Sequence, residues 1–249
     1  YGSMLSRVLG FTSSDNTGLT GLEKYYESYL AGADGEIAYP ADLVGAEIEG
    51  EAYYYPATEG LNIRLTIDAS VQEIAEAAME EVYAQYSPET AQCIVLDPDT
   101  FDVLAMAESP SYDLNDIPRD DPEQLNRLSR NNLISDIYEP GSTFKIVTAA
   151  ANIEEHLQGN SNAFSMQYIF NSSRTRTVDG TTIRCWSDHA NGKHSHQTLA
   201  EALNNSCNPC FTDIALSLGT ETFYEYLNLF HFGETTGIDF SGEAQGMLV

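Results

Sequence analysis

Basic residues are scarce in this sequence. Its 249 residues include 11 lysines and arginines against 38 acidic residues, so the net charge at pH 7 is −27. A surface this negative repels the phosphates of nucleic acids and of anionic lipids, which argues against a nucleic-acid partner and against membrane docking through a basic patch. No run approaches the roughly 18 consecutive apolar residues that a membrane span requires, and residues 1–7 lack the basic start and apolar centre of a signal peptide.

Cysteine is scarce too. The chain has Cys93, Cys185, Cys207 and Cys210, which are too few and too unevenly spaced for the disulfide framework of a small secreted protein. Apolar residues make up 42% of the chain, which is enough for a folded core in one large domain or two smaller ones. The sequence therefore predicts an acidic, globular protein.

A change of character near residue 60 predicts a domain boundary. Residues 1–60 are glycine-rich and irregular apart from a helical segment at Leu22–Leu30, whereas Leu61–Ile67 alternates apolar and polar residues as a half-buried strand does. A helix should follow, capped by Asp68 or Ser70 and ended before the next proline. Its apolar stripe is predicted to consist of Val71, Ile74, Ala75, Ala78 and Val82.

The remainder of the chain shows strand, loop and helix patterns in turn. Two strand-like runs, Gln92–Leu96 and Val103–Ala107, flank a turn and predict a hairpin. The polar stretches 108–132 and 159–197 predict loops, the second of them exposed. Helices are predicted over Phe144–Ile153, Thr198–Asn204 and Pro209–Leu218.

Ser142 and Lys145 form an S-x-x-K pattern at the head of a predicted helix, after the sharp entry of Pro140 and Gly141. Residues three apart share a helix face, so the hydroxyl and the amine can meet. A serine is a poor nucleophile until a base removes its proton, and a lysine becomes a base when burial or the positive end of a helix lowers its pKa. The pattern predicts a nucleophile beside its base, although a serine at a helix start often serves only as a cap.

A second polar triplet, Ser206-Cys207-Asn208, lies between two predicted helices. The Ser206 hydroxyl can relay a proton to a leaving group, and Asn208 offers a donor and an acceptor to a substrate amide. Asn208 also directly precedes Pro209 and can equally cap the helix that begins there. The sequence leaves both roles open.

Longer stretches carry a resemblance to a known family. They occur in order along almost the whole chain: GLEKYYESYLAGADG (21–35), LTIDASVQ (65–72), LAMAESPSYDLN (104–115), EPGSTFKIVTAA (139–150), NNSCNPCF (204–211) and TGIDFSGEAQG (236–246). Together they resemble class B penicillin-binding proteins, in the branch that serves cell division or sporulation. The resemblance implies an α+β transpeptidase fold shared with serine β-lactamases, with helices on a central antiparallel sheet. Residues 1–60 would be the end of an N-terminal pedestal, and 61–249 the N-terminal part of the transpeptidase domain.

The resemblance also implies a reaction, the D-Ala-D-Ala transpeptidation that crosslinks peptidoglycan stem peptides through an acyl-enzyme, and covalent binding of β-lactams such as penicillin. Ser142 would be the acylated nucleophile and Lys145 its base, while Ser206 would assist proton transfer to the leaving D-Ala and Asn208 would hold the peptide backbone. No cofactor is expected. Further partners would be a membrane-embedded glycosyltransferase and division or sporulation proteins, at the extracytoplasmic face of the bacterial membrane.

One motif of the family is missing. The K-[ST]-G strand contributes a lysine for the substrate carboxylate and half of the oxyanion hole, but here Lys193 is followed by His194 and no other lysine fits. We therefore expect a shortened chain, incomplete at its C-terminus and without a membrane anchor. We expect this chain by itself to lack transpeptidase activity and to react poorly with penicillin, which stoichiometric labelling of Ser142 by a fluorescent penicillin would refute.

The cysteines suggest a second property. Cys207 and Cys210 form a C-x-x-C before a predicted helix, a pattern typical of redox pairs. We hypothesise that oxidation of Cys207 with Cys185 or Cys210 distorts the second triplet and switches the complete enzyme off, the alternative being that these side chains only fill space. No metal site is predicted, because no common zinc finger has the spacing of Cys185, His189, His194 and His196.

Two other functions stay open at this point. A D,D-carboxypeptidase or a serine β-lactamase would share the catalytic pattern but not the pedestal-like start, and rapid turnover of penicillin would favour hydrolysis. A non-catalytic β-lactam-sensing or scaffold module would be acylated at Ser142 without passing the acyl group on. Detection of crosslinked product from paired stem peptides would exclude that module.

Overall fold

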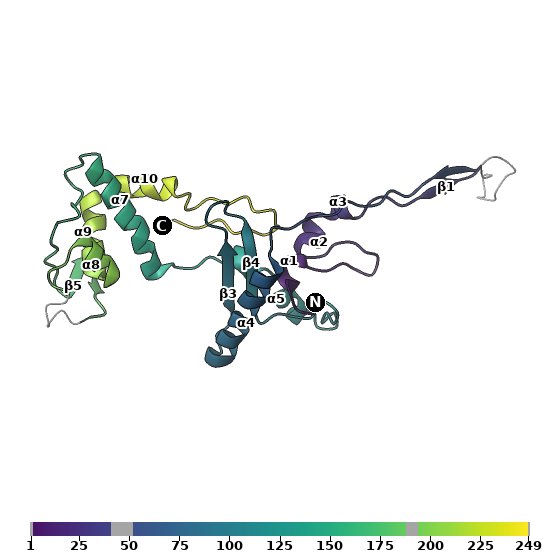
Figure 1. Cartoon of the computed structure of the whole chain (residues 1–249), viewed down its shortest axis with the longest axis horizontal. Coiled ribbons are helices and arrows are strands. Elements are labelled where there is room, and N and C mark those ends of the chain that lie inside the picture. The colour runs from purple at the N-terminus through teal and green to yellow at the C-terminus, as the bar shows by residue number, and fades with distance from the viewer. Residues whose placement is uncertain (1, 41–51, 188–193, 249) are drawn as a thin grey trace. The chain divides into compact units, whose positions relative to one another are not determined.

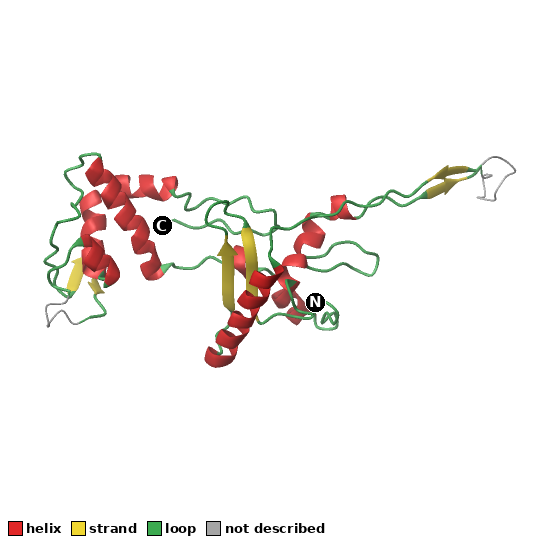
Figure 2. Cartoon of the chain, in the orientation of Figure 1, coloured by secondary structure: helices red, strands yellow, loops and turns green. Residues whose placement is uncertain are grey.

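The computed structural model describes residues 2–40, 52–187 and 194–248. The chain divides into two compact units: unit 1 comprises Tyr1–Asp136 with Thr235–Ala244, and unit 2 comprises Ile137–Glu234 with Gln245–Val249. Figure 1 labels their elements, and Figure 2 separates helices from strands. Helices combined with two-stranded antiparallel sheets confirm the predicted α+β class. The boundary expected near residue 60 stays a prediction.

Unit 1 combines helices with two hairpins. Its described helices are α1 (Ser6–Leu9), α2 (Gly21–Tyr25), α3 (Glu27–Leu30), α4 (Ala69–Tyr86), α5 (Pro122–Ser129) and α6 (Asn132–Ser135). Its described strands pair antiparallel as β1 (Glu36–Ala38) with β2 (Tyr53–Tyr55) and β3 (Ala91–Leu96) with β4 (Val103–Ser109). The predicted β3–β4 hairpin is confirmed, and the helical segment expected at Leu22–Leu30 is present as α2 and α3.

The core of unit 1 includes α4 packed on the β3–β4 hairpin. Asp68 caps α4 by accepting hydrogen bonds from the backbone N–H groups of Ser70 and Val71, as predicted. The predicted apolar stripe is wrong in part, because Ile74 is 71% exposed, Val82 is 38% exposed and Ala78 is exposed as well. The side chains that do meet across this contact are Val71, Ala75 and Met79 of α4 with Cys93, Val95, Ala105 and Ala107 of the hairpin.

Gln72 sets which face of α4 turns inward. Its Nε2 donates to the Met106 carbonyl and its Oε1 accepts from the Met106 N–H, both at 2.8 Å, and the side chain is fully buried. Because Gln72 points at β4, Ile74 two positions on points to solvent.

The prediction of a strand over Leu61–Ile67 is wrong, and the contacts of Gln72 give the reason. The alternate residues of this segment are half-buried, but Gln72 occupies the edge of β4 at Met106 in place of a neighbouring strand.

Residues 108–132 are more helical than predicted. Asp121 caps α5 by accepting from the Gln124 N–H at 3.0 Å, and Pro122 occupies its first turn. An Asp-Pro pair is a favourable helix start, because the proline lacks only an N–H that the first turn leaves unpaired. Leu128 of α5 then joins Phe11 and Tyr112 in a second apolar cluster, which fixes the N-terminal segment to this part of the unit.

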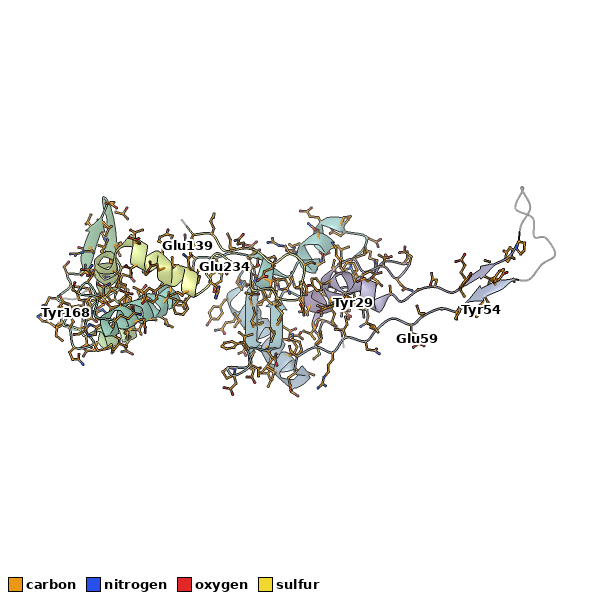
Figure 3. The ribbon with its side chains drawn as sticks, turned by 90° about the horizontal axis from the view of Figure 1, so that it is seen from above. Tyr29, Tyr54, Glu59, Glu139, Tyr168 and Glu234 are labelled. Atoms are coloured by element: carbon orange, nitrogen blue, oxygen red, sulfur yellow. The ribbon has the colours of Figure 1, made fainter. Side chains whose placement is uncertain are left out.

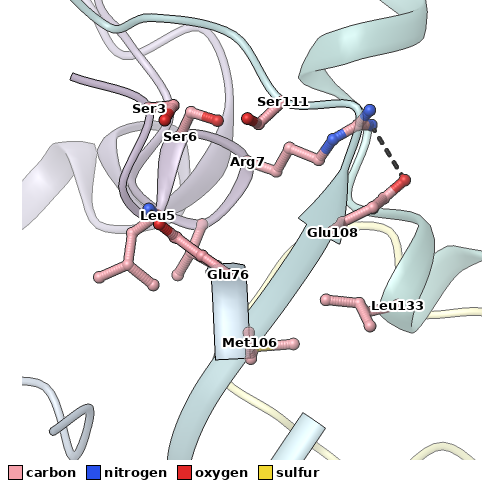
Figure 4. Close-up of a pocket in the computed structure, with 10 residues that line it drawn as sticks. Ser3, Leu5, Ser6, Arg7, Glu76, Met106, Glu108, Ser111 and Leu133 are labelled. Carbon is pink, nitrogen blue, oxygen red and sulfur yellow. Dashed lines mark hydrogen bonds and ion pairs between the residues drawn. The ribbon is translucent and has the colours of Figure 1, made fainter. Parts of the chain in front are cut away.

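A buried ion pair joins that N-terminal segment to β4. Arg7 Nη1 lies 3.4 Å from Glu108 Oε1, and the two side chains are 5% and 1% exposed. The guanidinium also donates to the backbone carbonyls of Arg130 and Pro110, each at 2.7 Å. Figure 4 shows the pair beside a small pocket that Met106 also lines. The guanidinium therefore has both a counter-charge and carbonyl acceptors.

The β1–β2 ribbon, by contrast, is exposed. Tyr53, Tyr54 and Tyr55 are 63%, 69% and 56% exposed, and none of them belongs to an apolar cluster of the described residues. Figure 3 shows Tyr54 on this ribbon. The ribbon adds cross-strand hydrogen bonds to unit 1 but no core.

Unit 2 is mainly helical. Its described elements are the 3₁₀-helix η1 (Gly141–Phe144), the helices α7 (Lys145–Leu157), α8 (Leu199–Asn204), α9 (Asn208–Leu218) and α10 (Thr220–Leu229), and the antiparallel pair β5 (Thr175–Val178) and β6 (Thr181–Arg184). The prediction of an exposed loop over 159–197 is wrong in part, since it contains this hairpin and the buried Phe170 and Cys185. Among the described residues, no helix of either unit is long and apolar enough to cross a membrane.

Candidate active site

One turn at the start of α7 presents Ser142 and Lys145. Gly141 has a φ of +58°, a left-handed conformation that glycine adopts without strain, and the chain then enters η1. Lys145 Nζ lies 2.9 Å from Ser142 Oγ. Ser142 is exposed whereas Lys145 is buried, so a substrate can reach the hydroxyl while the amine is shielded from water. The spacing of three residues does bring the two groups together.

The turn between α8 and α9 presents Ser206. The Ser206 N–H donates to the Leu203 carbonyl at 3.0 Å, and the Cys207 N–H donates to the Ala202 carbonyl at 2.9 Å. This pair of bonds is a Schellman C-cap, whose left-handed residue is usually glycine. Here that residue is Ser206, with a φ of 50°, a conformation that costs a residue with a side chain roughly 1–2 kcal/mol. The turn brings Ser206 Oγ to 2.9 Å from Lys145 Nζ.

Asn208 completes the cluster from the first position of α9. Its Oδ1 accepts from Lys145 Nζ at 2.6 Å, and its Nδ2 donates to the Arg184 carbonyl at 2.9 Å. The second bond assigns the orientation of the amide, because a carbonyl only accepts. Cys207, not Asn208, is the N-cap residue of α9, and it makes no side-chain cap. The capping alternative for Asn208 is therefore wrong.

Lys145 is surrounded by neutral acceptors. Burial lowers its pKa, and the negative charge of the Cys207 and Cys185 thiolates opposes that shift. A neutral amine has two N–H groups, which match two obligate acceptors, the Asn208 amide oxygen and the Ser206 carbonyl at 3.2 Å. Its lone pair is then available to the Ser142 hydroxyl. The geometry therefore accommodates the deprotonated form that a general base requires.

The three cysteines near this site, Cys185, Cys207 and Cys210, are buried and form no disulfide. Cys185 Sγ lies 3.3 Å from His194 Nδ1, and Cys210 Sγ lies 3.1 Å from Ser172 Oγ. Hydrogen bonding, first of all from the Cys210 thiol, holds the pKa of Cys207 well below the ordinary thiol value. The structure thus brings Cys185 and Cys207 behind the Ser206 turn, and their redox role stays a prediction.

The histidines considered as metal ligands differ in burial and in contacts. His194 is buried beside Cys185, and His196 is exposed with its Nδ1 against the Ser195 hydroxyl at 3.2 Å. His189 lies outside the described residues. Of these candidates, Cys185 and His194 therefore meet, whereas no spacing pattern in the chain links Cys207 to them.

The support that the end of β6 gives to this site was not predicted from the residue pattern. Besides the Arg184 carbonyl, the indole N–H of Trp186 donates to the Asn205 carbonyl at 2.8 Å. Both contacts cross more than fifteen residues and use backbone carbonyls, whose positions no residue pattern encodes. The end of β6 therefore fixes the turn from which Ser206 and Asn208 point at Lys145.

Comparison with known families agrees with this geometry. Residues 91–249 match the family model of the penicillin binding protein transpeptidase domain, and residues 3–65 match that of the penicillin-binding protein dimerisation domain. The chain belongs to the penicillin-binding proteins. The match to both domains is consistent with a class B penicillin-binding protein and confirms the resemblance seen in the sequence.

Individual penicillin-binding proteins are similar along the whole chain. Stage V sporulation protein D of Bacillus subtilis is 39% identical over 249 residues, 100% of this chain and 37% of that protein. Peptidoglycan D,D-transpeptidase FtsI of Escherichia coli is 27% identical over 99% of this chain and 39% of its own length. The chain thus spans less than half the length of the curated relatives it matches.

Solved structures give the same fold. A peptidoglycan synthetase from Bifidobacterium adolescentis superposes with a TM-score of 0.82 at 27% identity, covering 100% of this chain and 43% of that one. Penicillin binding protein 3 from Mycobacterium tuberculosis, complexed with ampicillin, gives a TM-score of 0.79 at 25% identity and covers 100% and 49%. These solved structures confirm the transpeptidase fold expected from the sequence.

Proposed function

We propose that this protein is a serine D-Ala-D-Ala transpeptidase that crosslinks peptidoglycan stem peptides and binds β-lactams covalently. One observation carries the proposal: a buried amine, Lys145 Nζ, lies 2.9 Å from two hydroxyls, those of Ser142 and Ser206. An exposed hydroxyl beside a buried amine is an activated nucleophile, and the second hydroxyl gives the proton a way out.

The acylation step follows from these positions. Ser142 Oγ attacks the carbonyl carbon of the penultimate D-Ala while its proton moves to Lys145 Nζ. The peptide C–N bond then breaks, and a proton passes through the Ser206 hydroxyl to the leaving D-Ala nitrogen. Asn208 holds the substrate backbone, and the Ser142 N–H supplies part of the oxyanion hole. An acceptor amine attacks the acyl-enzyme and loses a proton, which restores the Ser142 hydroxyl.

A β-lactam would enter the same sequence at its first step. Attack of Ser142 opens the ring amide, but the leaving nitrogen stays tethered to the acyl group, so it remains in the way of the next nucleophile. The relatives' names support both reactions: one is a peptidoglycan D,D-transpeptidase, and another was solved with ampicillin. Nothing in the mechanism requires a cofactor.

We place the protein at the extracytoplasmic face of the bacterial membrane, where peptidoglycan is assembled. Its partners there would include a membrane-embedded glycosyltransferase and proteins of division or sporulation. The name of the Bacillus subtilis relative supports sporulation, and that of the Escherichia coli relative supports peptidoglycan crosslinking.

The decisive experiment uses the product of the complete gene. A fluorescent penicillin should label it stoichiometrically, and mass spectrometry should place the adduct on the peptide that contains Ser142. Ser142→Ala should abolish labelling, whereas Ser195→Ala, another serine of unit 2, should leave it unchanged. Labelling that survives Ser142→Ala would contradict the proposal.

The alternatives are separated by what happens to the acyl group. Crosslinked product from paired stem peptides supports transpeptidation, release of D-Ala without crosslinking supports a D,D-carboxypeptidase, and rapid turnover of penicillin supports a serine β-lactamase. A stable adduct without any of these products would indicate a sensing or scaffold module.

The redox hypothesis has its own test. Acylation rates measured with and without dithiothreitol should differ if oxidation of Cys207 with Cys185 or Cys210 displaces Ser206 and Asn208. Equal rates, with the thiols shown to be oxidised in the untreated sample, would leave the cysteines a purely structural role.

A further inference from the structure

Two cysteines and a histidine converge behind the active-site turn. Cys185 directly follows β6, and Cys207 lies in the turn between α8 and α9. His194 lies between them in sequence. Their ligand atoms all lie within 4.8 Å of one another, and the three residues are 3%, 0% and 3% exposed. Among the described residues, no other group of three or more His, Cys, Asp or Glu side chains meets at such distances.

These distances match a coordination polyhedron. Zinc binds sulfur at about 2.3 Å and imidazole nitrogen at about 2.0 Å, so neighbouring ligand atoms of a tetrahedral site lie about 3.5–3.8 Å apart. The separation of Cys185 Sγ from His194 Nδ1 is 3.3 Å, and the remaining pairs are within 4.8 Å. Side-chain shifts of no more than about 1 Å would therefore bring all three atoms to one ion.

The burial of His194 is not explained if this side chain only fills space in the core. An imidazole is rarely buried without a polar task, and this one directs Nδ1 at a thiol while its ring meets Trp186 edge-on, with centroids 5.3 Å apart. Two thiols and an imidazole form a soft donor set that favours thiophilic ions over Mg²⁺ or Ca²⁺. A disulfide between the cysteines would need no imidazole.

We propose that Cys185, His194 and Cys207 bind a thiophilic metal ion, with Zn²⁺ as the test ion, in a buried three-residue site behind the Ser206 turn. His194 donates the lone pair of Nδ1. Each thiol that carries a proton before binding releases it to solvent, and no group is oxidised or reduced. A tetrahedral ion keeps its fourth position for an exogenous ligand.

The site would act on the catalytic turn through Cys207. This residue lies between Ser206 and Asn208, and Cys185 lies next to Arg184, whose carbonyl holds the Asn208 amide. A metal ion joining the two cysteines would cross-link β6 to the α8–α9 turn at the point where these groups are positioned. Metal occupancy would also keep the two thiols from forming a disulfide.

The experiment measures metal binding, not activity. The chain is reduced with a phosphine, stripped of metal and titrated with Zn²⁺ at neutral pH. The expected result is one zinc per chain, release of protons to the buffer, and a change in the fluorescence of Trp186, the one tryptophan of the sequence. Co²⁺ should give a thiolate-to-metal charge-transfer band, and Mg²⁺ should give none of these signals.

Variants separate the proposed ligands from the other thiols. Cys185→Ser and His194→Asn should each weaken zinc binding at least about tenfold, the lower limit for disturbing even the outer partners of a metal site. Cys93→Ser is the matched control and should bind as the parent chain does. Thermal unfolding in zinc should shift upward for the parent and this control only, and circular dichroism establishes that each variant is folded.

Three results would overturn the site. They are a parent chain that binds less than half an equivalent of zinc, zinc binding that survives both Cys185→Ser and His194→Asn in folded protein, and loss of binding in Cys93→Ser. Because none of these measurements uses a peptide or a β-lactam, their failure is distinct from a failure of the proposed transpeptidase function.

Discussion

Two buried cations, Arg7 in unit 1 and Lys145 in unit 2, are held in opposite ways. Burial lowers the pKa of Arg7 and raises that of Glu108, and the attraction between the two charges opposes both shifts. Lys145 has no ion-pair partner among the described residues and is surrounded by hydroxyl, amide and carbonyl oxygens. A guanidinium stays protonated in either setting, whereas an ammonium in the second can lose its proton. A buried cation that is paired with a carboxylate therefore stabilises the fold, whereas a buried, uncompensated amine among neutral oxygens can lose its proton and act as a base.

Lys145→Arg tests directly whether the uncompensated amine acts as a base. It keeps the positive charge and the hydrogen-bond donors but removes the base, so the acylation rate of the complete gene product should fall by about 10²–10⁴-fold. Stopped-flow or gel-based labelling with a fluorescent penicillin measures this rate. Lys24→Arg changes an exposed lysine of unit 1 and should leave it unaltered. Acylation at the parent rate in Lys145→Arg would show that another group takes the Ser142 proton.

Lys145 itself was predictable because its chemistry is local. The S-x-x-K spacing places it on the face of Ser142, and the capping signal of Asp68 and the proline and glycine around α9 are equally local. Gln72 was not predictable, because its partner is the backbone of a strand more than thirty residues away. The Arg184 carbonyl that holds Asn208 escaped for the same reason: a backbone acceptor has no signature in the sequence.

The next largest effect concerns the compensated cation. Arg7→Ala leaves the Glu108 carboxylate buried without its counter-charge, so the free energy of unfolding should fall by about 3–5 kcal/mol. Urea unfolding of the chain followed by circular dichroism measures it. Asp136→Asn, which breaks the exposed Arg130–Asp136 pair, is the control and should cost no more than about 1 kcal/mol. Equal losses in the two variants would mean that burial does not distinguish the pairs.

The pH dependence of acylation tests the protonation state of Lys145. Burial lowers the pKa of Lys145 from its ordinary value of 10.5, so the neutral amine becomes populated at lower pH than in an exposed lysine. The acylation rate should rise with pH as the amine loses its proton and level off below pH 10.5. A pH profile of labelling, with Lys145→Arg as the flat reference, tests this. A profile still rising steeply above that value would contradict a lowered pKa.

The Ser206 turn offers a smaller test, which separates backbone strain at Ser206 from the role of its hydroxyl. Ser206→Gly relieves a left-handed residue and should raise the free energy of unfolding by roughly 1 kcal/mol, while the loss of its hydroxyl slows acylation. Ser87, at the C-terminal end of α4 with a φ of 48°, offers the matched control. Ser87→Gly should give a similar gain in stability with no change in acylation. A higher free energy of unfolding in only one of the two variants would show that the surroundings of the serine, and not its φ angle, determine its effect on stability.

The two hydrogen bonds of Gln72 also limit where the β3–β4 sheet can gain a strand. The side-chain amide bonds both backbone groups of Met106, so a further strand cannot pair with β4 at that edge. No described strand lies along the opposite rim, formed by Ala91–Leu96. Any strand that enlarges this sheet, from the same polypeptide or from another molecule, therefore adds beside β3.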